Sequence, residues 1–550
     1  MEGPDARARW LVAAISFALV CYPPLLSFSE DGILACFRYF AADAFYYLTI
    51  AARSGAADAF TFDGTYAVNG FHPLWCWWLT SSFEWFGLDS RSQLVFTLFA
   101  SVGFTALGAA LIASACLRFT RSLGLSLLCV VPGFYYWLVP TTNGQYGALW
   151  NFANGMETPL TLFFFGVLID ALSRRGLPKS TSSVLALSLL LTVLTLSRLD
   201  DVFLFVPFIA AGLWTAAPGS DRVRVAIAWV AIPTLVIGSY LAWNLSYAGA
   251  ALPLSGASKA SGLAVFRNSY ALLTTLFPWA DVARQSSLEL WGSEAWRLLQ
   301  MVIPALAAAA WIFSGRRSPE GWRTRLADSI DGPLLVLAGY VLLKAGYNFV
   351  FVSLWLQGHW YYPASIVIFN VIAAIALSRT LSFPETRVWK AVSGIALAVF
   401  LLVASSTWAS LKARRDDHVR MYELWSARAA LETELERVCP GCGVLSFDDG
   451  IVAFALERPS MNGLGLELDR EAVEARKGGR LLEIAHARGF RLLTSLNYPF
   501  ADELEAQELR TRLEAWPQLE AEPLEAWSFE IVHRDPASGA WFIRFEPASR

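Results

Sequence analysis

Residues 94–117 read LVFTLFASVGFTALGAALIASACL, an apolar stretch without a single charge. An α-helix rises about 1.5 Å per residue, so a run of this length can cross the hydrocarbon core of a bilayer, which is about 30 Å thick. Hydropathy predicts further spans at 10–28, 123–140, 158–173, 182–197, 202–216, 225–245, 297–314, 332–355, 363–379 and 389–410. The sequence therefore predicts a polytopic α-helical membrane protein with about eleven transmembrane helices.

The composition of the whole chain favours the same class. Of its 550 residues, 55% are hydrophobic and only 16% are charged, and the mean hydropathy is +0.45. Soluble domains carry about 25% charged residues. The 23 Trp, 37 Phe and 17 Tyr suit the two interfaces of a bilayer, where aromatic side chains concentrate. The sequence has no basic tail or Lys/Arg-rich run, so nucleic-acid binding is not expected.

The distribution of Arg and Lys predicts the orientation, because cytoplasmic loops carry an excess of them. The Arg- and Lys-bearing loops all fall on the side of the N-terminus if the Trp-rich stretch 72–88 does not cross the membrane. We therefore predict an interfacial helix at 72–88 on the outer leaflet, within a first outer loop at 29–93. The span at 10–28 is expected to be an uncleaved first helix in the inner (plasma) membrane, with a cytoplasmic N-terminus.

The composition changes abruptly after residue 411. We predict a transmembrane domain over 1–411 and a small soluble extracytoplasmic domain, α/β or α+β, over 412–550. Residues 412–436 have the charge spacing of a helix. Strand patterns occur at 443–456, which includes an Asp-Asp-Gly turn, at 490–494 and at 541–545.

Cys439 and Cys442 differ from the other cysteines, which lie in or beside apolar segments as small buried hydrophobes. A Cys-Pro-Gly-Cys stretch in an exported domain predicts a structural disulfide, with two free thiols as the alternative. A zinc site would need two more ligands nearby, and a redox pair would need a thioredoxin-like context that the sequence lacks.

Asp43 lies in the most informative part of the first outer loop. Ala-Phe-Tyr-Tyr-Leu follows it at 44–48, so the carboxylate is expected to be desolvated on one side and wet on the other. A carboxylate in that setting can serve as a general base. It could instead cap a helix over 44–52, a position that Asp favours, and the two roles are compatible.

Several different short motifs are distributed along the rest of the chain. They are Phe-Asp-Gly at 62–64, Asn-Gly-Phe-His-Pro-Leu-Trp at 69–75, Asn-Gly-Met-Glu-Thr-Pro at 154–159, Ser-Arg-Leu-Asp at 197–200, Leu-Pro-Leu-Ser at 252–255 and His-Trp-Tyr-Tyr-Pro at 359–363. Their order and spacing resemble the GT-C fold glycosyltransferases, integral membrane enzymes that use polyprenyl-phosphate-linked sugars. The resemblance points to the bacterial branch related to protein O-mannosyltransferases and lipid A aminoarabinose transferases.

The resemblance implies that Asp43 takes the proton of an acceptor hydroxyl as it attacks the anomeric carbon, inverting that centre, and that Glu157 supplies a second acidic position. The leaving group is already an anionic lipid phosphate, so positive charge or hydrogen-bond donors should assist it. The expected phosphate ligands are Arg198, Lys259, His72 and His359, and the expected substrate-binding residues are Tyr46, Tyr47, Asn69, Asn154 and Tyr361. Alanines flank Asp43 where many family members have a further acid. No cofactor is therefore assigned, and a divalent metal, Mg²⁺ or Mn²⁺, is left open.

Each of these candidates also has a structural interpretation. Glu157 could stabilise the first turn of the following helix by charge–dipole interaction. Arg198 and Asp200 could form an interfacial ion pair. Lys259 could be a snorkelling surface lysine, and His72 could be a packed amphipathic side chain.

Lys344 lies within the apolar run 332–355. An ionisable side chain there is expected to face the bundle interior or a water-filled cavity, but the sequence does not identify its partner.

Two other functions compete with the transferase, namely a transporter or flippase of lipid-linked saccharides and a surface-polysaccharide polymerase or ligase of another fold. Transporters commonly show inverted repeats and polar breaks at mid-membrane depth. In this chain the polar motifs are spread over several outer loops instead. The expected partners are a polyprenyl-phosphate sugar donor, a glycan, lipid or protein acceptor, and the lipid bilayer.

Overall fold

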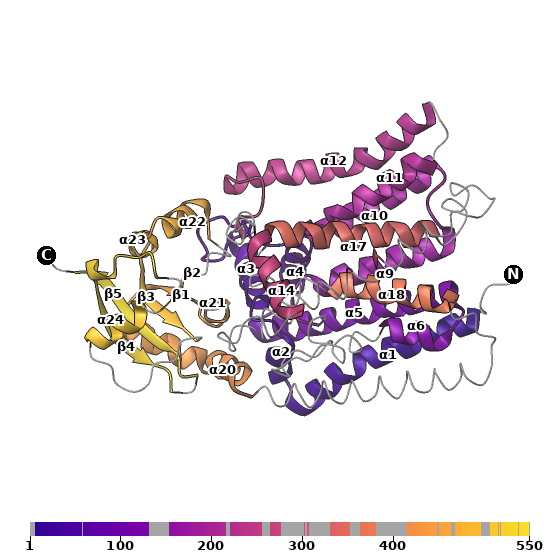
Figure 1. The fold of residues 1–550 in the computed structure, drawn as a ribbon. Coiled ribbons are helices and arrows are strands. Elements are labelled where there is room, and N and C mark those ends of the chain that lie inside the picture. The colour runs from indigo at the N-terminus through magenta and orange to yellow at the C-terminus, as the bar shows by residue number, and fades with distance from the viewer. Residues whose placement is uncertain are drawn as a thin grey trace, which may run out of the picture. The chain divides into compact units, whose positions relative to one another are not determined.

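The computed structural model describes residues 6–57, 59–130, 153–215, 220–255, 264–276, 302, 305–306, 331–352, 363–380, 415–447, 450–463, 468–496, 506–514, 516, 519–536 and 538–548. The chain divides into two compact units, and Figure 1 labels their elements. The helical unit comprises Met1–Glu30, Leu98–Ser239 and Ala260–Ala413. The mixed unit comprises Asp31–Thr97, Tyr240–Lys259 and Arg414–Arg550.

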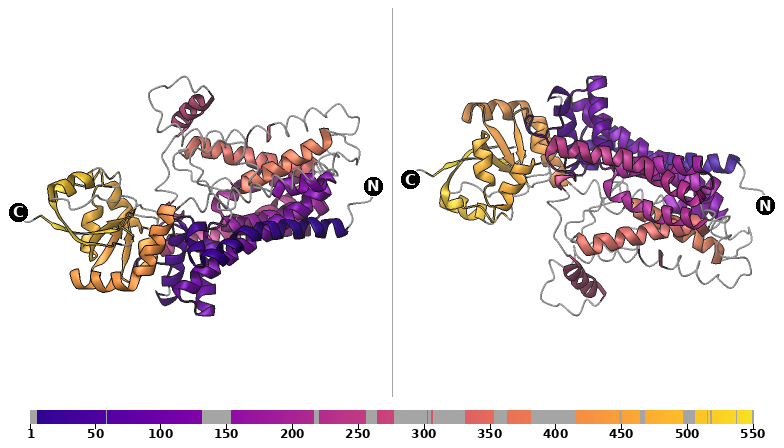
Figure 2. Two further views of the ribbon diagram at one scale, coloured as in Figure 1. Left: turned by 90° about the horizontal axis from the view of Figure 1, so that it is seen from below. Right: turned by 90° about the horizontal axis from the view of Figure 1, so that it is seen from above.

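The helical unit is built from long apolar helices. They are α1 (Ala6–Asp31), α5 (Ser90–Thr120), α6 (Leu123–Val130), α9 (Thr158–Arg175), α10 (Thr181–Ser197), α11 (Phe205–Thr215), α12 (Ser220–Ala248), α14 (Val265–Leu276), α17 (Asp331–Phe351) and α18 (Pro363–Thr380), of which α1, α5 and α12 run on into the mixed unit. Several of them, including α5, α9, α17 and α18, run lengthwise in much the same direction in the views of Figures 1 and 2.

Four helices within the described residues are long and apolar enough to cross a membrane: Ala6–Asp31, Ser90–Thr120, Arg222–Ala248 and Gly332–Phe351. The helices are thus those of a membrane protein, as the composition indicates. The number of eleven spans stays a prediction, because 131–140, most of 297–314 and the whole of 389–410 lie outside the described residues.

Close helix contact in this unit depends on two glycines. A Cβ atom on Gly108 of α5 would lie 2.8 Å from the carbonyl oxygen of Leu162, and one on Gly166 of α9 would lie 2.8 Å from the carbonyl oxygen of Gly108. Small residues let two helix backbones approach closely inside a membrane, where the hydrophobic effect does not drive helices together. Packing of α5 on α9 therefore requires glycine at both positions.

A break between α10 and α11 positions several charged residues. Helix α10 ends at Ser197, and Arg198 is extended, with φ −151° and ψ 109°. The 3₁₀ helix η1 (Leu199–Leu204) follows and carries Asp200 and Asp201 in its first turn, before α11 resumes regular helix at Phe205.

The mixed unit contains a five-stranded sheet in the order β2-β1-β3-β5-β4. Strand β1 (Gly443–Ser446) pairs in parallel with β2 (Ser460–Asn462) and β3 (Phe490–Ser495), while β5 (Trp541–Pro547) is antiparallel to β3 and to β4 (Trp527–Arg534). The helical elements of this region are α20 (Arg415–Val438), α21 (Ile451–Ala455), α22 (Arg470–Lys477), α23 (Leu481–Ala487), α24 (Ala506–Glu514) and the 3₁₀ turn η6 (Leu524–Ala526). The strand predicted over 443–456 is present at Gly443–Ser446 but is wrong at Ile451–Ala455, which is helical.

The segment predicted as the first outer loop contains α2 (Leu34–Tyr39), α3 (Ala44–Ala57) and α4 (Pro73–Phe86), which belong to the same unit as the sheet. Helix α4 begins with Pro at its first position and is followed by Gly87 as its C-cap, whose φ of 60° is left-handed. Trp75 and Leu79 are fully buried, whereas Trp85 is 85% exposed. The helix predicted at 72–88 is therefore present, and its place at a membrane interface stays a prediction.

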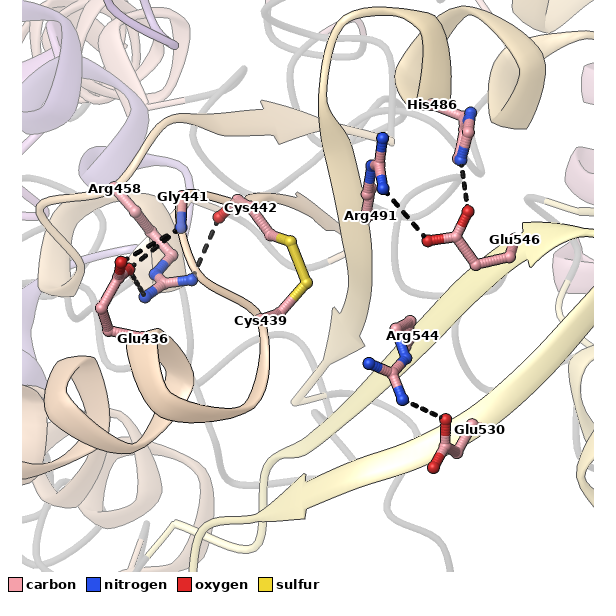
Figure 3. The surroundings of a disulfide bond; sticks show 10 residues. All are labelled: Glu436, Cys439, Gly441, Cys442, Arg458, His486, Arg491, Glu530, Arg544 and Glu546. Atoms are coloured by element: carbon pink, nitrogen blue, oxygen red, sulfur yellow. Dashed lines mark hydrogen bonds and ion pairs between the residues drawn. A yellow bond between two sulfur atoms is a disulfide. The ribbon is translucent and has the colours of Figure 1, made fainter.

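Cys439 and Cys442 are joined by a disulfide just after α20, with 5.5 Å between their Cα atoms (Figure 3). The guanidinium of Arg458 donates a hydrogen bond of 3.0 Å to the carbonyl oxygen of Cys442. The bridged turn is thereby held against the segment that follows α21.

Candidate active site

Asp43 stands at the start of α3 and is half-buried. Its carbonyl oxygen accepts the amide of Tyr46 at 3.3 Å, and the amide of Phe45 donates to Ala42 at 3.1 Å, so the first turn of the helix forms directly around it. Residues 44–50 behind it are all buried. The carboxylate is thus half-buried where an apolar helix begins, and its role as a general base stays a prediction.

Two tyrosines follow Asp43 on α3 and are almost completely buried, with Tyr46 3% and Tyr47 6% exposed. The ring of Tyr46 packs on that of Phe62 at 5.8 Å between centroids. The hydroxyl of Tyr47 accepts the backbone amide of His72 at 3.3 Å. Both tyrosines therefore help to hold the loop together, and their contact with substrate stays a prediction.

Asn69 is fully buried and connects the segment between α3 and α4 to the segment after α12. Its side-chain amide donates to the carbonyl oxygen of Ala250 at 3.1 Å and its side-chain oxygen accepts the amide of Leu254 at 3.1 Å. Asp63 forms the neighbouring turn, because one of its oxygens accepts the amides of Thr65 and Tyr66 at 2.7 and 2.8 Å. These contacts give both residues a structural role.

A second group of candidates lies in the helical unit. Glu157 immediately precedes α9 and is 1% exposed, and one of its carboxylate oxygens accepts a hydrogen bond of 2.7 Å from Nη1 of Arg198, which is 3% exposed. The Nε of Arg198 lies 2.9 Å from Asp200. The ion pair of Arg198 and Asp200 is therefore present, and the same guanidinium also holds Glu157.

The partners of Lys344 become visible in the same unit. Its ammonium lies 2.6 Å from Oδ1 of Asp201 and 3.3 Å from Oδ2 of Asp200, and it donates a hydrogen bond of 3.2 Å to the hydroxyl of Tyr340. The Tyr340 hydroxyl in turn donates to Asp201 at 2.5 Å. Lys344 is 2% exposed and Asp201 is completely buried.

The five ionisable side chains Glu157, Arg198, Asp200, Asp201 and Lys344 are called the charge cluster below. If all of them are ionised, three carboxylates face two cations, and the cluster carries one net negative charge. Buried charges persist only when they are paired and hydrogen-bonded. The ion pairs therefore account for charged residues at this place among apolar helices.

Other candidates give less information. Asn154 is buried, and its side-chain oxygen accepts the amide of Met156 at 3.1 Å, so it shapes the turn before Glu157. His72 is half-buried at the N-cap of α4. Lys259, His359 and Tyr361 lie outside the described residues.

Within the part of the chain that the structure describes, no group of three or more His, Cys, Asp or Glu is arranged to hold a metal ion. Mg²⁺ prefers carboxylate oxygens, but the three carboxylates of the charge cluster already face the Arg198 and Lys344 cations. The described residues therefore do not supply a metal site.

Sequence reasoning missed Asp201, Tyr340 and Arg53. The signal for Asp201 was a second acid directly after Asp200 in an apolar region, matching the unexplained Lys344. Arg53 stood out only as a lone cation in the apolar stretch of α3. Some of the residues that it contacts, Leu456 and Arg458, are more than 400 positions away along the chain.

Neither a protein-family model nor a curated protein sequence matches this chain. Among solved structures, it is similar to the oligosaccharyltransferase of Archaeoglobus fulgidus tethered to an acceptor peptide containing the NVT sequon, with a TM-score of 0.52, 12% identity, and 99% of this chain and 74% of that chain covered. The archaeal oligosaccharyltransferase AglB from Archaeoglobus fulgidus, in complex with an inhibitory peptide and a dolichol-phosphate, gives a TM-score of 0.50 at 12% identity, with 98% of this chain and 74% of that chain covered. ArnT from Cupriavidus metallidurans bound to undecaprenyl phosphate gives a TM-score of 0.48 at 11% identity, with 97% of each chain covered.

The similarity to the oligosaccharyltransferase extends over nearly the whole chain and defines the fold. The resemblance to GT-C fold glycosyltransferases is therefore confirmed for the fold. At 12% identity it does not by itself assign the reaction.

Proposed function

We propose that this chain is a membrane glycosyltransferase that transfers a sugar from a polyprenyl-phosphate-linked donor to a glycan, lipid or protein acceptor of the cell envelope. The observation that carries the proposal is the shared fold with the archaeal oligosaccharyltransferase, whose structures contain an acceptor peptide or a dolichol-phosphate. A polymerase or ligase of another fold is disfavoured by the same observation. The reaction would take place at the extracytoplasmic face of the inner (plasma) membrane, with the N-terminus in the cytoplasm and residues 412–550 outside.

Asp43 is the general base in this proposal. Its carboxylate accepts the proton of the acceptor hydroxyl while that oxygen bonds to the anomeric carbon of the sugar. The bond from that carbon to the phosphate oxygen breaks on the opposite side, and its electron pair leaves with the lipid phosphate. A single displacement of this kind inverts the anomeric centre, and no acid is needed at the leaving group.

Positive charge would stabilise the departing phosphate. His72, Lys259 and His359 are the proposed ligands, whereas Arg198, the fourth candidate from the sequence, is already paired with Glu157 and Asp200. Glu157 is kept as the alternative base, although its carboxylate is buried and already hydrogen-bonded to Arg198. No step requires a metal, and dependence on Mg²⁺ or Mn²⁺ is a matter for the assay.

In the test, purified protein is incubated with radiolabelled polyprenyl-phosphate sugars, one at a time, and cleavage of the donor and transfer of the sugar are measured. Asp43→Asn should lower turnover by a factor of about 100 to 10,000, the usual loss when a general base is removed. Asn caps helices about as well as Asp, so the fold should be kept.

Asp63→Asn is the matched control, because it makes the same chemical change in the same loop. Asn supports the Asx-type turn that Asp63 forms, so its turnover should stay near that of the wild type. If Asp43→Asn turns over within a factor of about three of wild type, a far smaller loss than base removal gives, Asp43 is not the base and the role passes to Glu157. If no donor in the panel is cleaved, the transferase proposal fails.

A further inference from the structure

Arg53 has an unusual set of partners for a cation in the middle of an apolar helix. Its Nη1 donates to the carbonyl oxygen of Phe62 at 2.7 Å, and its Nη2 donates to the carbonyl oxygens of Ala453, Leu456 and Arg458 at 2.8, 3.0 and 3.1 Å. The last three carbonyls belong to the end of α21 and the segment after it. The guanidinium of Arg53 on α3 thus binds the C-terminal end of α21, which lies about 400 positions further along the chain.

The other end of α21 also touches α3. Gly450, at the N-cap of α21, has a φ of 93°, and a Cβ atom there would lie 2.8 Å from Cδ1 of Tyr46 and 3.0 Å from the carbonyl carbon of Phe45. Between the two ends, the ring of Phe454 packs on that of Phe45 at 5.8 Å. Helix α21 therefore lies against α3 from the turn after Asp43 to Arg53.

The segment behind α21 is itself firmly held. Arg458 donates from Nε to Glu432 of α20 at 2.9 Å and from Nη1 to the carbonyl oxygen of Cys442 at 3.0 Å. Glu432 also accepts the backbone amide of Glu457 at 2.7 Å. Helix α3 is thus fastened to a segment that is anchored to α20 and to the bridged turn.

We infer that Arg53 is a positioning residue for Asp43, because it locks α3 onto α21 and so fixes the helix whose first turn carries the carboxylate. This inference rests on the proposed role of Asp43. It also assigns the C-terminal region a function, since α21 forms part of the support of the catalytic loop. Burial lowers the pKa of Arg53 from 12.5 to about 10, so the side chain remains charged at neutral pH.

A general base works only within a narrow range of positions. A displacement of about 1 Å can cost roughly 100-fold in rate, and sites must be held to about 0.5 Å by the residues around them. Lysine keeps the charge of arginine but lacks its planar fork of donors, so it cannot hold several carbonyls in the same way. Arg53→Lys should therefore loosen α3 while it leaves the charge in place.

The experiment compares wild type, Arg53→Lys and Gly450→Ala in the donor assay and by hydrogen exchange of the amides of residues 44–50. In both variants kcat should fall at least about tenfold, the KM for donor should change less, and the α3 amides should exchange faster. Gly450→Ala reaches the same contact from the other side, because its methyl group collides with α3. It keeps the test decisive if Arg53→Lys does not fold.

Arg510→Lys is the matched control, since Arg510 donates to the carbonyl oxygen of Trp527 at 3.1 Å in the same unit, away from α3. It should leave kcat and the exchange of residues 44–50 unchanged. Unchanged kcat and exchange in both test variants would overturn the inference, and so would a loss of kcat without faster exchange of α3. If the α3 amides exchange faster in the variants but the wild-type protein cleaves no donor, the contact of Arg53 with α21 is supported and the transferase proposal is overturned instead.

Discussion

Removing the ammonium of Lys344 should destabilise the protein strongly. In Lys344→Met, Asp201 loses a contact of 2.6 Å and Asp200 one of 3.3 Å, and Asp201 keeps the hydroxyl of Tyr340 at 2.5 Å as its side-chain donor within the described residues. The net charge of the cluster changes from one negative charge to two. Breaking a buried ion pair from one side costs about 3–5 kcal/mol, because the remaining charge stays buried without compensation.

The second variant removes both members of the pair. Lys344→Met with Asp201→Asn leaves Glu157, Asp200 and Arg198, so the cluster carries one net negative charge, as in the wild type. Replacing both members of a buried pair by uncharged groups of similar size is often close to neutral. The double variant should therefore recover at least about half of the stability lost in the single one.

Denaturant titration in detergent micelles gives the free energy of unfolding by linear extrapolation. The 23 tryptophans of the chain provide the fluorescence signal. Lys477→Met, at an exposed position of α22, is the control and should stay within about 0.5 kcal/mol of wild type. A loss below about 1 kcal/mol in Lys344→Met, or a double variant as unstable as the single one, would refute the interpretation of the cluster as a compensated buried network.

Two further predictions concern the covalent structure and the topology. Cys439 and Cys442 in protein purified from an oxidising compartment should be alkylated only after reduction, as intact mass will show, and two freely alkylated thiols or bound zinc would contradict the disulfide. In a background whose native cysteines do not react, Trp85→Cys should be labelled by an impermeant reagent from outside and Arg175→Cys should not. Labelling at Arg175→Cys from outside would reverse the orientation.

Sequence patterns predicted the elements whose signal is local. The run at 363–379 became α18 within one residue at each end, and the strands predicted at 490–494 and 541–545 became β3 and β5. The length of an apolar run or the alternation of a strand is contained in the segment itself, so it can be read without knowing the neighbours. The error at 451–455 has the same origin, because a short apolar run with no clear period fits a strand or a buried helix equally well.

The partners of the charged residues could not be predicted in the same way. Asp201 and Lys344 are 143 positions apart, and Arg53 and Ala453 are 400 apart. A charge in an apolar segment shows only that it needs a partner, because burying it alone would be too costly. Which residue becomes the partner depends on how the helices pack. From the sequence alone, several acidic residues could equally well have paired with Lys344.

The pairing of Arg198 bears on how the donor phosphate could be held. A guanidinium that faces the carboxylates of Glu157 and Asp200 at 2.7 and 2.9 Å already meets more negative charge than it carries. An incoming phosphate would compete with both carboxylates, and at 3% exposure Arg198 presents little surface to it. The geometry therefore favours the alternative in which Arg198 fixes Glu157 and Asp200 beside η1. The other candidates that the sequence provides for holding the phosphate are His72, Lys259 and His359.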